Sequence, residues 1–272
     1  MYIVADIGGT RTRIAKSIDL ENIEDPIIID TPKNYEDGVA GIIRISKQLA
    51  GNEKIDAMAL DITGLISEDS KTPLTAIHLP DWKGRSLGRE LEAALSTTAH
   101  LLNDTAQVGL GEAVYGAGKG ADIVVYVTVS TGIGGVCIVD GKIDPAGYGS
   151  EIGGQYLYVG GSPKTLEDLV SGRAIEERFE MSPKHIKKDS PVWEELAQLF
   201  AYGLHNTILH WSPDRVVLGG SMFNEVGISV ERVRAHVAEI MRKFPEVPEI
   251  VHSQLGDIGG LWGGVARLKQ IG

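Results

Sequence analysis

The chain has 272 residues, of which 43% are hydrophobic and 23% are charged. This composition supports a sizeable core and excludes disordered or fibrous chains, and the length favours two medium domains. The 26 basic and 37 acidic residues give a net charge of -11, which disfavours general attraction to nucleic acid or to anionic membranes. We therefore expect neither of these as a partner.

The sequence gives few signs of an oxidising compartment or of a membrane. Cys137 is the single cysteine, which excludes an internal disulfide and a thiolate zinc cluster. The N-terminus lacks the basic region of a secretory signal, and the longest uncharged stretch, residues 123–139, is too short and too rich in glycine for a membrane span. We expect a cytoplasmic location.

The first half of the chain predicts two strand pairs of the same design. Residues 2–19 have apolar residues at alternating positions on either side of a Gly-Gly-Thr turn, which predicts a hairpin. Residues 123–143 predict a second hairpin around a turn of small residues. Between them, residues 55–64 predict a strand, residues 86–99 a helix, and residues 99–104 a short strand.

The second half predicts mostly helices. A helix begins after Ser190 as N-cap with Pro191 as its first residue, and another begins at Ser229 and carries Met241 on its apolar side. Residues 214–221 predict a strand and residues 259–270 a terminal helix. Alternating strands and helices imply an α/β fold, and the two similar hairpins suggest a duplicated plan with a cleft between the halves.

The first glycine turn has the features of a phosphate site. Gly8 and Gly9 let backbone N–H groups approach an anion, and Thr10 adds a hydroxyl. A carboxylate at Asp6 is useful beside phosphate when a divalent cation, or its water shell, stands between them. The alternative is a tight hairpin turn with Asp6 beside it.

Two further glycine turns extend this pattern. Residues 130–135 again place hydroxyls and glycines between buried strands, with Thr131 and Gly132 as candidate phosphate ligands. Gly219 and Gly220 follow a predicted strand and would let a purine or ribose lie against bare backbone, although a simple turn explains them equally well. Together the three turns indicate a nucleoside triphosphate bound in a cleft.

Six motifs occur in an order that is typical of one family. They are "DIGGT", "LLNDTAQVGLGEAVYGAGKG", "VSTGIGGVCIVDGKI", "YGSEIGG", "LEDLVSGRAI" and "RVVLGGS". With them the whole chain resembles the ROK family of sugar kinases (repressor, open reading frame, kinase) within the actin-like ATPase superfamily.

The resemblance implies an α/β, ribonuclease H-like fold duplicated into two lobes about a central cleft. The N-terminal lobe would comprise residues 1–105 and the C-terminal helix 258–272, and the second lobe residues 106–257. The implied reaction is transfer of the γ-phosphoryl group of ATP, with Mg²⁺, to a hexose hydroxyl, usually on C6. Family members often form homodimers, which the resemblance allows here.

The same resemblance assigns site residues. Asp104 would be the general base and Asn103 would bind sugar hydroxyls. A positioned carboxylate is a simple device for accepting the proton that leaves the attacking hydroxyl. The local alternative is that Asn103 and Asp104 cap a helix, and both roles are compatible. Glu151 and Glu167 fall where the family places sugar-binding glutamates, although each alone is typical of a solvated surface charge.

The chain departs from the family pattern in three places. Gly154 replaces a histidine that contacts sugar and zinc, and Gln155 is the candidate substitute. The cysteine-rich zinc loop is absent, so we expect no zinc site. The Pro-Gly sugar loop reads Thr63-Gly64, which keeps Gly64 as the candidate substrate-binding residue of the loop. The seven histidines show no metal-binding spacing and are expected to be scattered.

These departures leave rival functions open. One is a non-catalytic sugar or nucleotide sensor on the same fold, and retention of Asp6 and Asp104 argues against it. Another is an actin-like kinase with a non-sugar acceptor. A DNA-binding repressor is disfavoured because such members carry an extra domain ahead of the first glycine turn, which here begins at residue 8.

Overall fold

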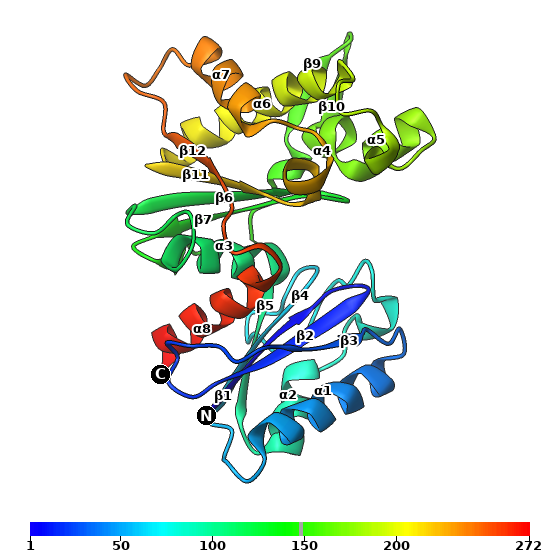
Figure 1. Cartoon of the computed structure of the whole chain (residues 1–272), viewed down its shortest axis with the longest axis vertical. Coiled ribbons are helices and arrows are strands. Elements are labelled where there is room, and N and C mark those ends of the chain that lie inside the picture. Colours follow the sequence, from blue (N-terminus) through cyan, green and yellow to red (C-terminus); the bar gives the residue numbers. More distant parts are fainter. Residues whose placement is uncertain (147–148) are drawn as a thin grey trace. The chain divides into compact units, whose positions relative to one another are not determined.

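The computed structural model describes residues 1–146 and 149–272, so that Tyr148 of the "YGSEIGG" motif lies outside the described residues. The chain forms two compact units (Figure 1). Unit 1 comprises Met1–Tyr115 and Leu255–Gly272, and unit 2 comprises Gly116–Gln254.

Unit 1 is built on a five-stranded mixed sheet with the order β3-β2-β1-β4-β5. The β1 strand pairs with β2 in antiparallel and with β4 in parallel orientation, and β4 pairs in parallel with β5. The carboxyl ends of β1, β4 and β5 therefore meet at one edge of the sheet. The strands are β1 (Tyr2–Ile7), β2 (Arg11–Ser17), β3 (Ile27–Asp30), β4 (Ala57–Ile62) and β5 (Thr98–Asn103).

Helices cover both faces of this sheet. Because side chains alternate along a strand, Ile3 and Ile7 of β1 face the core under α1 (Tyr35–Ala50) and α2 (Leu87–Leu95), whereas Val4 faces α8 (Gly259–Ile271). Helix α3 (Asp104–Val114) packs against α8. The last segment of the chain thus completes unit 1.

Unit 2 repeats the strand order of unit 1. Its sheet has the order β8-β7-β6-β11-β12, with an antiparallel hairpin β6-β7 and parallel pairing of β6, β11 and β12. The duplicated plan predicted from the two hairpins is therefore present in the topology. The strands are β6 (Ile123–Val129), β7 (Ile133–Val139), β8 (Lys142–Ile143), β11 (Arg215–Gly219) and β12 (Glu249–His252).

The helices of unit 2 pack on its sheet through a separate core. Phe200, Leu204 and Val233 belong to one buried hydrophobic cluster with side chains of β6 and β11. A two-stranded hairpin precedes the first of these helices. These elements are β9 (Tyr156–Val159), β10 (Ser162–Thr165), α4 (Leu166–Val170), α5 (Gly172–Phe179), α6 (Val192–Trp211) and α7 (Val230–Ile240).

The predicted α/β class and both hairpins are confirmed, but three element boundaries are wrong. The helix predicted over residues 86–99 ends at Leu95, because Ser96 adopts a left-handed φ of 50° and the chain then enters β5. Helix α6 has Pro191, not Ser190, as its N-cap, and Met241 follows α7 as its C-cap.

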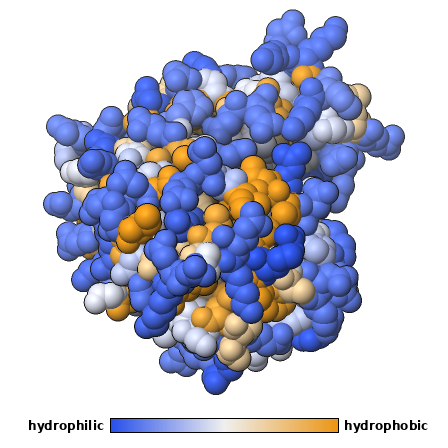
Figure 2. All heavy atoms as spheres, turned by 60° about the horizontal axis from the view of Figure 1, so that its bottom comes forward, coloured by the Kyte–Doolittle hydropathy of each residue, from blue (hydrophilic) through white to orange (hydrophobic). Residues whose placement is uncertain are grey.

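The face shown in Figure 2 is largely hydrophilic, with smaller hydrophobic patches between hydrophilic residues. Large hydrophobic residues such as Ile77 and Tyr158 are more than 70% exposed, at 75% and 78%. Within the described residues, no helix is both long and apolar enough to span a bilayer.

Candidate functional site

The predicted first phosphate turn follows β1 and its carbonyl groups are all bound inside unit 1. Thr31 donates its hydroxyl to the oxygen of Gly8 at 2.7 Å and its N–H to the oxygen of Thr10 at 2.9 Å, while Lys33 Nζ donates to the oxygen of Gly9 at 2.6 Å. With their carbonyls engaged, the turn residues leave amide groups and the exposed Thr10 side chain as the polar groups available to a ligand.

The amide groups of the turn differ in their availability. Gly8 donates its N–H to the oxygen of Arg11 at 3.0 Å, which closes the hairpin. Within the described part of the chain, the N–H groups of Gly9 and Thr10 have no acceptor. Two adjacent amides with the ammonium group of Lys33 beside them form an arrangement that favours an anion.

Sequence reasoning missed two residues at this turn. Lys33 also donates to the oxygen of His78 at 3.1 Å, and a Cβ on Gly9 would lie 2.6 Å from the His78 Cβ. Gly9 is therefore required by close packing. Neither side chain belongs to a motif, and only the pairing of the strands and loops brings them to the turn.

Asp6 lies beside a second carboxyl that the sequence analysis did not identify. Asp6 and Asp61 are register partners on the parallel strands β1 and β4, and their carboxyl groups are hydrogen-bond neighbours. Burial raises the pKa of the Asp6 carboxyl, while Arg13 Nη1, 3.0 Å from Oδ2, opposes the rise. Burial raises the pKa of Asp61 well above its ordinary value, and the negative charges of Asp6 and Asp104 add to this.

Gln107 fixes the buried side of this carboxyl pair. Its Nε2 donates to Asp61 Oδ2 at 2.8 Å and to the oxygen of Gly260 at 2.9 Å. Asp61 is 1% exposed, whereas the side chain of Asp6 is 21% exposed. Asp6 is thus the member of the pair that a ligand can reach.

The predicted catalytic pair begins α3. Asn103 caps the helix by accepting the N–H of Ala106 at 3.1 Å, so the predicted cap is present. Its Nδ2 donates to the oxygen of Gly64 at 3.1 Å. Asp104 accepts the N–H of Thr105 on Oδ1 at 2.7 Å and the hydroxyl of Thr63 on Oδ2 at 2.8 Å. Asn103, Asp104 and Gly64 therefore lie together in unit 1.

The second predicted phosphate turn, between β6 and β7, is braced by unit 2. The N–H groups of Gly172 and Arg173, at the start of α5, donate to the oxygens of Ser130 and Thr131 at 2.7 and 3.2 Å. The Ser130 hydroxyl accepts the N–H of Ser221 at 3.0 Å, which ties the turn to the segment after β11.

Glu167 supports this turn directly. Its Oε2 accepts the N–H of Ile133 at 2.8 Å, and its Oε1 accepts Arg173 Nη2 at 2.7 Å. A Cβ on Gly132 would lie 2.8 Å from Glu167 Oε2, which accounts for the glycine. Glu167, predicted as a sugar ligand, is in this structure a brace for the glycine turn.

The third glycine pair, after β11, is explained by internal packing. A Cβ on Gly219 would lie 2.6 Å from the Tyr126 hydroxyl, and a Cβ on Gly220 would overlap the carbonyl oxygen of Val129. Gly220 also has a φ of +92°, which favours glycine. These positions need glycine independently of a nucleotide.

The remaining predicted sugar residues flank the short 3-10 turn Ile152–Gly154. Glu151 is exposed, and Gln155 is held by α6: its Oε1 accepts Asn206 Nδ2 at 3.3 Å and its Nε2 donates to the oxygen of Ile152 at 3.0 Å. The turn packs on β7, where a Cβ on Gly153 would lie 2.7 Å from the oxygen of Ile133.

Comparison with known proteins identifies the family. The family model described as "ROK family" matches residues 2–271. The chain belongs to the ROK family. Its ROK relatives include a fructokinase of Pediococcus pentosaceus, 24% identical over 96% of this chain and 94% of the relative, and a glucokinase of Streptomyces coelicolor, 25% identical over 97% and 96%.

Solved ROK structures share the fold of the whole chain. A ROK hexokinase from Thermus thermophilus aligns with a TM-score of 0.87 at 22% identity, covering 99% of this chain and 98% of that one. A ROK glucokinase from Streptomyces griseus, solved with glucose and AMPPNP, aligns with a TM-score of 0.79 at 23% identity, covering 100% of this chain and 99% of that one. A ROK transcriptional regulator, a homolog of the E. coli MLC protein, aligns with a TM-score of 0.84 at 19% identity, covering 99% of this chain and 77% of that one. The actin-like ATPase fold predicted from the motifs is thereby confirmed.

Proposed function

We propose that this ROK protein is an ATP-dependent sugar kinase that transfers the γ-phosphoryl group to a hexose hydroxyl, with the hydroxyl on C6 as the acceptor. The observation that carries the proposal is the Asp104 carboxylate, held by two donors at the start of α3 beside the Thr63-Gly64 loop. The sugar kinases among the ROK relatives support the same reaction.

Asp104 acts as the general base in this proposal. A carboxylate within hydrogen-bond reach of the acceptor hydroxyl takes its proton as the oxygen attacks phosphorus. Asn103 and the Gly64 backbone bind neighbouring sugar hydroxyls, because the cap and the loop contact leave Asn103 one N–H and lone pairs on Oδ1. The remaining barrier is lowered by alignment and by neutralisation of the phosphate charge.

The phosphates of ATP bind the glycine turns. In unit 1 the ligands are the N–H groups of Gly9 and Thr10 with Lys33 beside them, and in unit 2 they are the residues around Thr131 and Gly132. Gly219 and Gly220 remain candidates for contact with the nucleoside. The structure of the Streptomyces griseus relative with AMPPNP supports ATP as the donor.

Mg²⁺ is the expected cofactor, and the residues present fit it. The described residues contain no cluster of three or more histidine, cysteine or acidic side chains suited to a metal ion. One accessible carboxylate, Asp6, beside a phosphate-binding turn suits Mg²⁺, which keeps most of its waters and binds substrate phosphate. Bound there through water, Mg²⁺ would neutralise charge on the transferred group. The lack of a zinc site stays a prediction from the sequence.

Unit 2 carries its own proposed sugar-binding residues. Glu151 and Glu167 are the proposed sugar ligands, and Glu167 keeps free lone pairs on both oxygens while it braces the turn. Gln155 takes the place of the missing histidine. The lobe boundaries at 105/106 and 257/258 and the homodimer also remain proposals.

A screen for ADP release over glucose, fructose, mannose, allose and N-acetylhexosamines tests the function. We expect turnover with at least one hexose, and NMR of the product should show the phosphate on C6. Asp104→Asn should lower kcat by about 10²- to 10⁴-fold, the usual contribution of a general base. Its thermal unfolding midpoint should stay close to that of the wild type, since the amide keeps the shape of the carboxylate.

The alternative is a sensor that binds sugar without phosphorylating it. The changed Thr63-Gly64 loop and the Gln155 contacts with α6 favour it, and a ROK protein described as a transcriptional regulator shares the fold. Sugar binding by calorimetry without ADP release would support the sensor. Full activity of Asp104→Asn would instead refute the assignment of the base.

A further inference from the structure

Thr63 contacts the proposed base directly. Its Oγ1 lies 2.8 Å from Asp104 Oδ2, and the carboxylate can only accept in this contact, so Thr63 donates. The N–H of Thr105 occupies Oδ1 at 2.7 Å. Each oxygen of the carboxylate is thus bound to one donor, and the two donors come from different segments, the loop that follows β4 and the first turn of α3.

The backbone that carries Thr63 is itself fixed on both sides. Asn103 Nδ2 binds the oxygen of Gly64 at 3.1 Å, and the N–H of Leu65 donates to the Thr75 hydroxyl at 2.8 Å. Gly64 has a φ of +121°, and a Cβ there would overlap the Thr75 carbonyl group. The loop therefore has little freedom, and the Thr63 hydroxyl has a defined direction.

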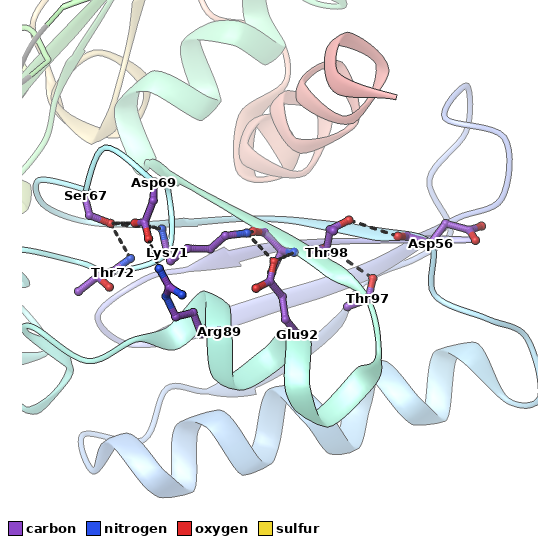
Figure 3. A network of polar contacts seen from close by, with 10 residues as sticks. Asp56, Ser67, Asp69, Lys71, Thr72, Arg89, Glu92, Thr97 and Thr98 are labelled. Carbon is purple, nitrogen blue, oxygen red and sulfur yellow. Dashed lines mark hydrogen bonds and ion pairs between the residues drawn. The ribbon is translucent and has the colours of Figure 1, made fainter.

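The far end of the same loop is anchored to the edge of the unit 1 sheet (Figure 3). The side chain of Lys71 extends to the start of β5, where its Nζ contacts Glu92 Oε1 at 2.5 Å and the oxygen of Ala99. The N–H of Leu101 donates to the oxygen of Ser70 at 2.9 Å. The loop that follows β4 is thus held against β5 at Gly64, Ser70 and Lys71.

We propose that Thr63 is a positioning residue: its hydroxyl holds the Asp104 carboxylate in a single orientation, ready to accept the proton of the substrate hydroxyl. The inference rests on the proposed kinase function. Thr63 has its one proton committed to Asp104, so it is not itself the base. The ROK pattern has proline at this position, and since proline has no hydroxyl, the contact belongs to this chain's departure from the pattern.

A hydroxyl with this role affects turnover more than binding. Without it, one carboxylate oxygen loses its donor and the side chain can turn away from the acceptor. A small misplacement of a reacting group costs rate even when the fold is intact. A hydroxyl that only stabilised the start of α3 would change the unfolding midpoint and leave kcat alone.

The test compares Thr63→Val, which removes the hydroxyl and keeps the shape, with Thr63→Ser, which keeps the hydroxyl. Thr72→Val is the matched control, because it makes the same change in the same loop. Among the described residues, the Thr72 hydroxyl makes no hydrogen bond; only its backbone groups do. We expect Thr63→Val to lower kcat by about tenfold or more. KM for sugar and for ATP and the unfolding midpoint should stay near those of Thr72→Val, and Thr63→Ser should restore most of the rate.

Other outcomes separate the two levels of the argument. Wild-type kcat in Thr63→Val, with Asp104→Asn inactive, would overturn the role of Thr63 and leave the kinase proposal standing. Loss of rate in both Thr63 variants together with a lower unfolding midpoint would also overturn it. A wild-type protein that transfers phosphate to none of the sugars would overturn the proposed function and, with it, this inference.

Discussion

At the scale of single residues, the Asp6–Asp61 pair combines a reachable carboxyl with a buried one. The two groups lie side by side on parallel strands, and burial raises the pKa of both. Two ionised carboxylates in contact repel, so the pair is favoured when it holds a proton. Gln107 donates to Asp61 and orients it toward Asp6.

Asp61→Asn should therefore stabilise the protein at neutral and alkaline pH. The pKa of Asp61 is higher in the folded state than in the unfolded state. At pH values between these two pKa values the folded state binds more protons, so the free energy of unfolding falls as the pH rises through this range. Asparagine cannot ionise and can still accept from Gln107. The advantage of the variant in free energy of unfolding should grow with pH, by at most about 1.4 kcal/mol per pH unit for one proton.

Urea unfolding of wild type and Asp61→Asn at pH 5 and pH 8 measures this difference. Met58→Leu, a buried apolar change on the same strand, is a control that should show no dependence on pH relative to wild type. A wild-type protein that gains stability over Asp61→Asn as the pH rises would show that Asp61 is favoured as a carboxylate.

The residues that sequence reasoning found and missed differ in their signals. Asn103 and Asp104 stand at a strand end and a helix start, and both signals are local. Lys33, His78 and Asp61 reach the site only through the pairing of strands and loops, which no local pattern encodes. Thr63 was visible as a departure from the family motif, but its bond to Asp104 depends on the register of β4 and β5.

At the scale of elements, strand alternation and glycine turns predicted the two hairpins because the pattern is local. The sequence analysis did not assign α1, although Asn34 caps it and acidic residues occupy its first turn. The end of α2 was misplaced because Ser96 takes a left-handed conformation that propensity does not indicate. Thr98 and Ala99, included in the predicted helix, pair instead with Ala57 and Met58 of β4.

The packing of α3 against α8 depends on glycines. A Cβ on Gly263 of α8 would overlap the carbonyl oxygen of Gln107 on α3, and a Cβ on Gly111 would lie 2.5 Å from the oxygen of Gly259. The two helix backbones are therefore in direct contact. Since Gln107 also orients Asp61, the spacing of these helices bears on the carboxyl pair.

Gly263→Ala should destabilise the protein by about 1–3 kcal/mol, the usual cost of forcing extra volume into a packed site. Gly41→Ala in α1 is the matched control, because the added Cβ would have its nearest neighbour at 3.5 Å and would meet no close contact. This change should stabilise the protein by about 0.5–1 kcal/mol through helix propensity. Denaturant unfolding measures both. Equal effects of the two variants would show that α3 and α8 can separate without cost.

At the scale of the whole molecule, the net charge of -11 opposes the approach of a polyanion. Affinity for a triphosphate must then come from local groups, such as the N–H groups of Gly9 and Thr10 and the ammonium of Lys33. Fold and charge therefore act separately: the sheet places the strand ends together, and a few polar atoms there determine what binds.

The two units also differ in how the chain builds them. Unit 2 is continuous, and the hydrophobic cluster beneath its helices, as far as the structure describes it, consists of residues of unit 2 alone. Unit 1 is discontinuous, and Leu261, Val265 and Leu268 of α8 cover the sheet face formed by Val4, Ala15 and Ala59. Without the last segment, this apolar face would be exposed to water, at a cost in free energy of about 25 cal/mol for each Å² of apolar surface.

We therefore expect residues 116–254 to fold alone, and residues 1–115 to fold only when residues 255–272 are joined to them through a flexible linker. Thermal unfolding by circular dichroism distinguishes the three proteins: a cooperative transition for 116–254 and for the linked chain, and none for 1–115. A linked chain carrying Val265→Asp is the control and should behave like 1–115, because a buried unpaired charge cannot cover the apolar face. A cooperative transition in 1–115 itself would mean that the sheet with α1 and α2 is sufficient, and that α8 adds to a unit already formed.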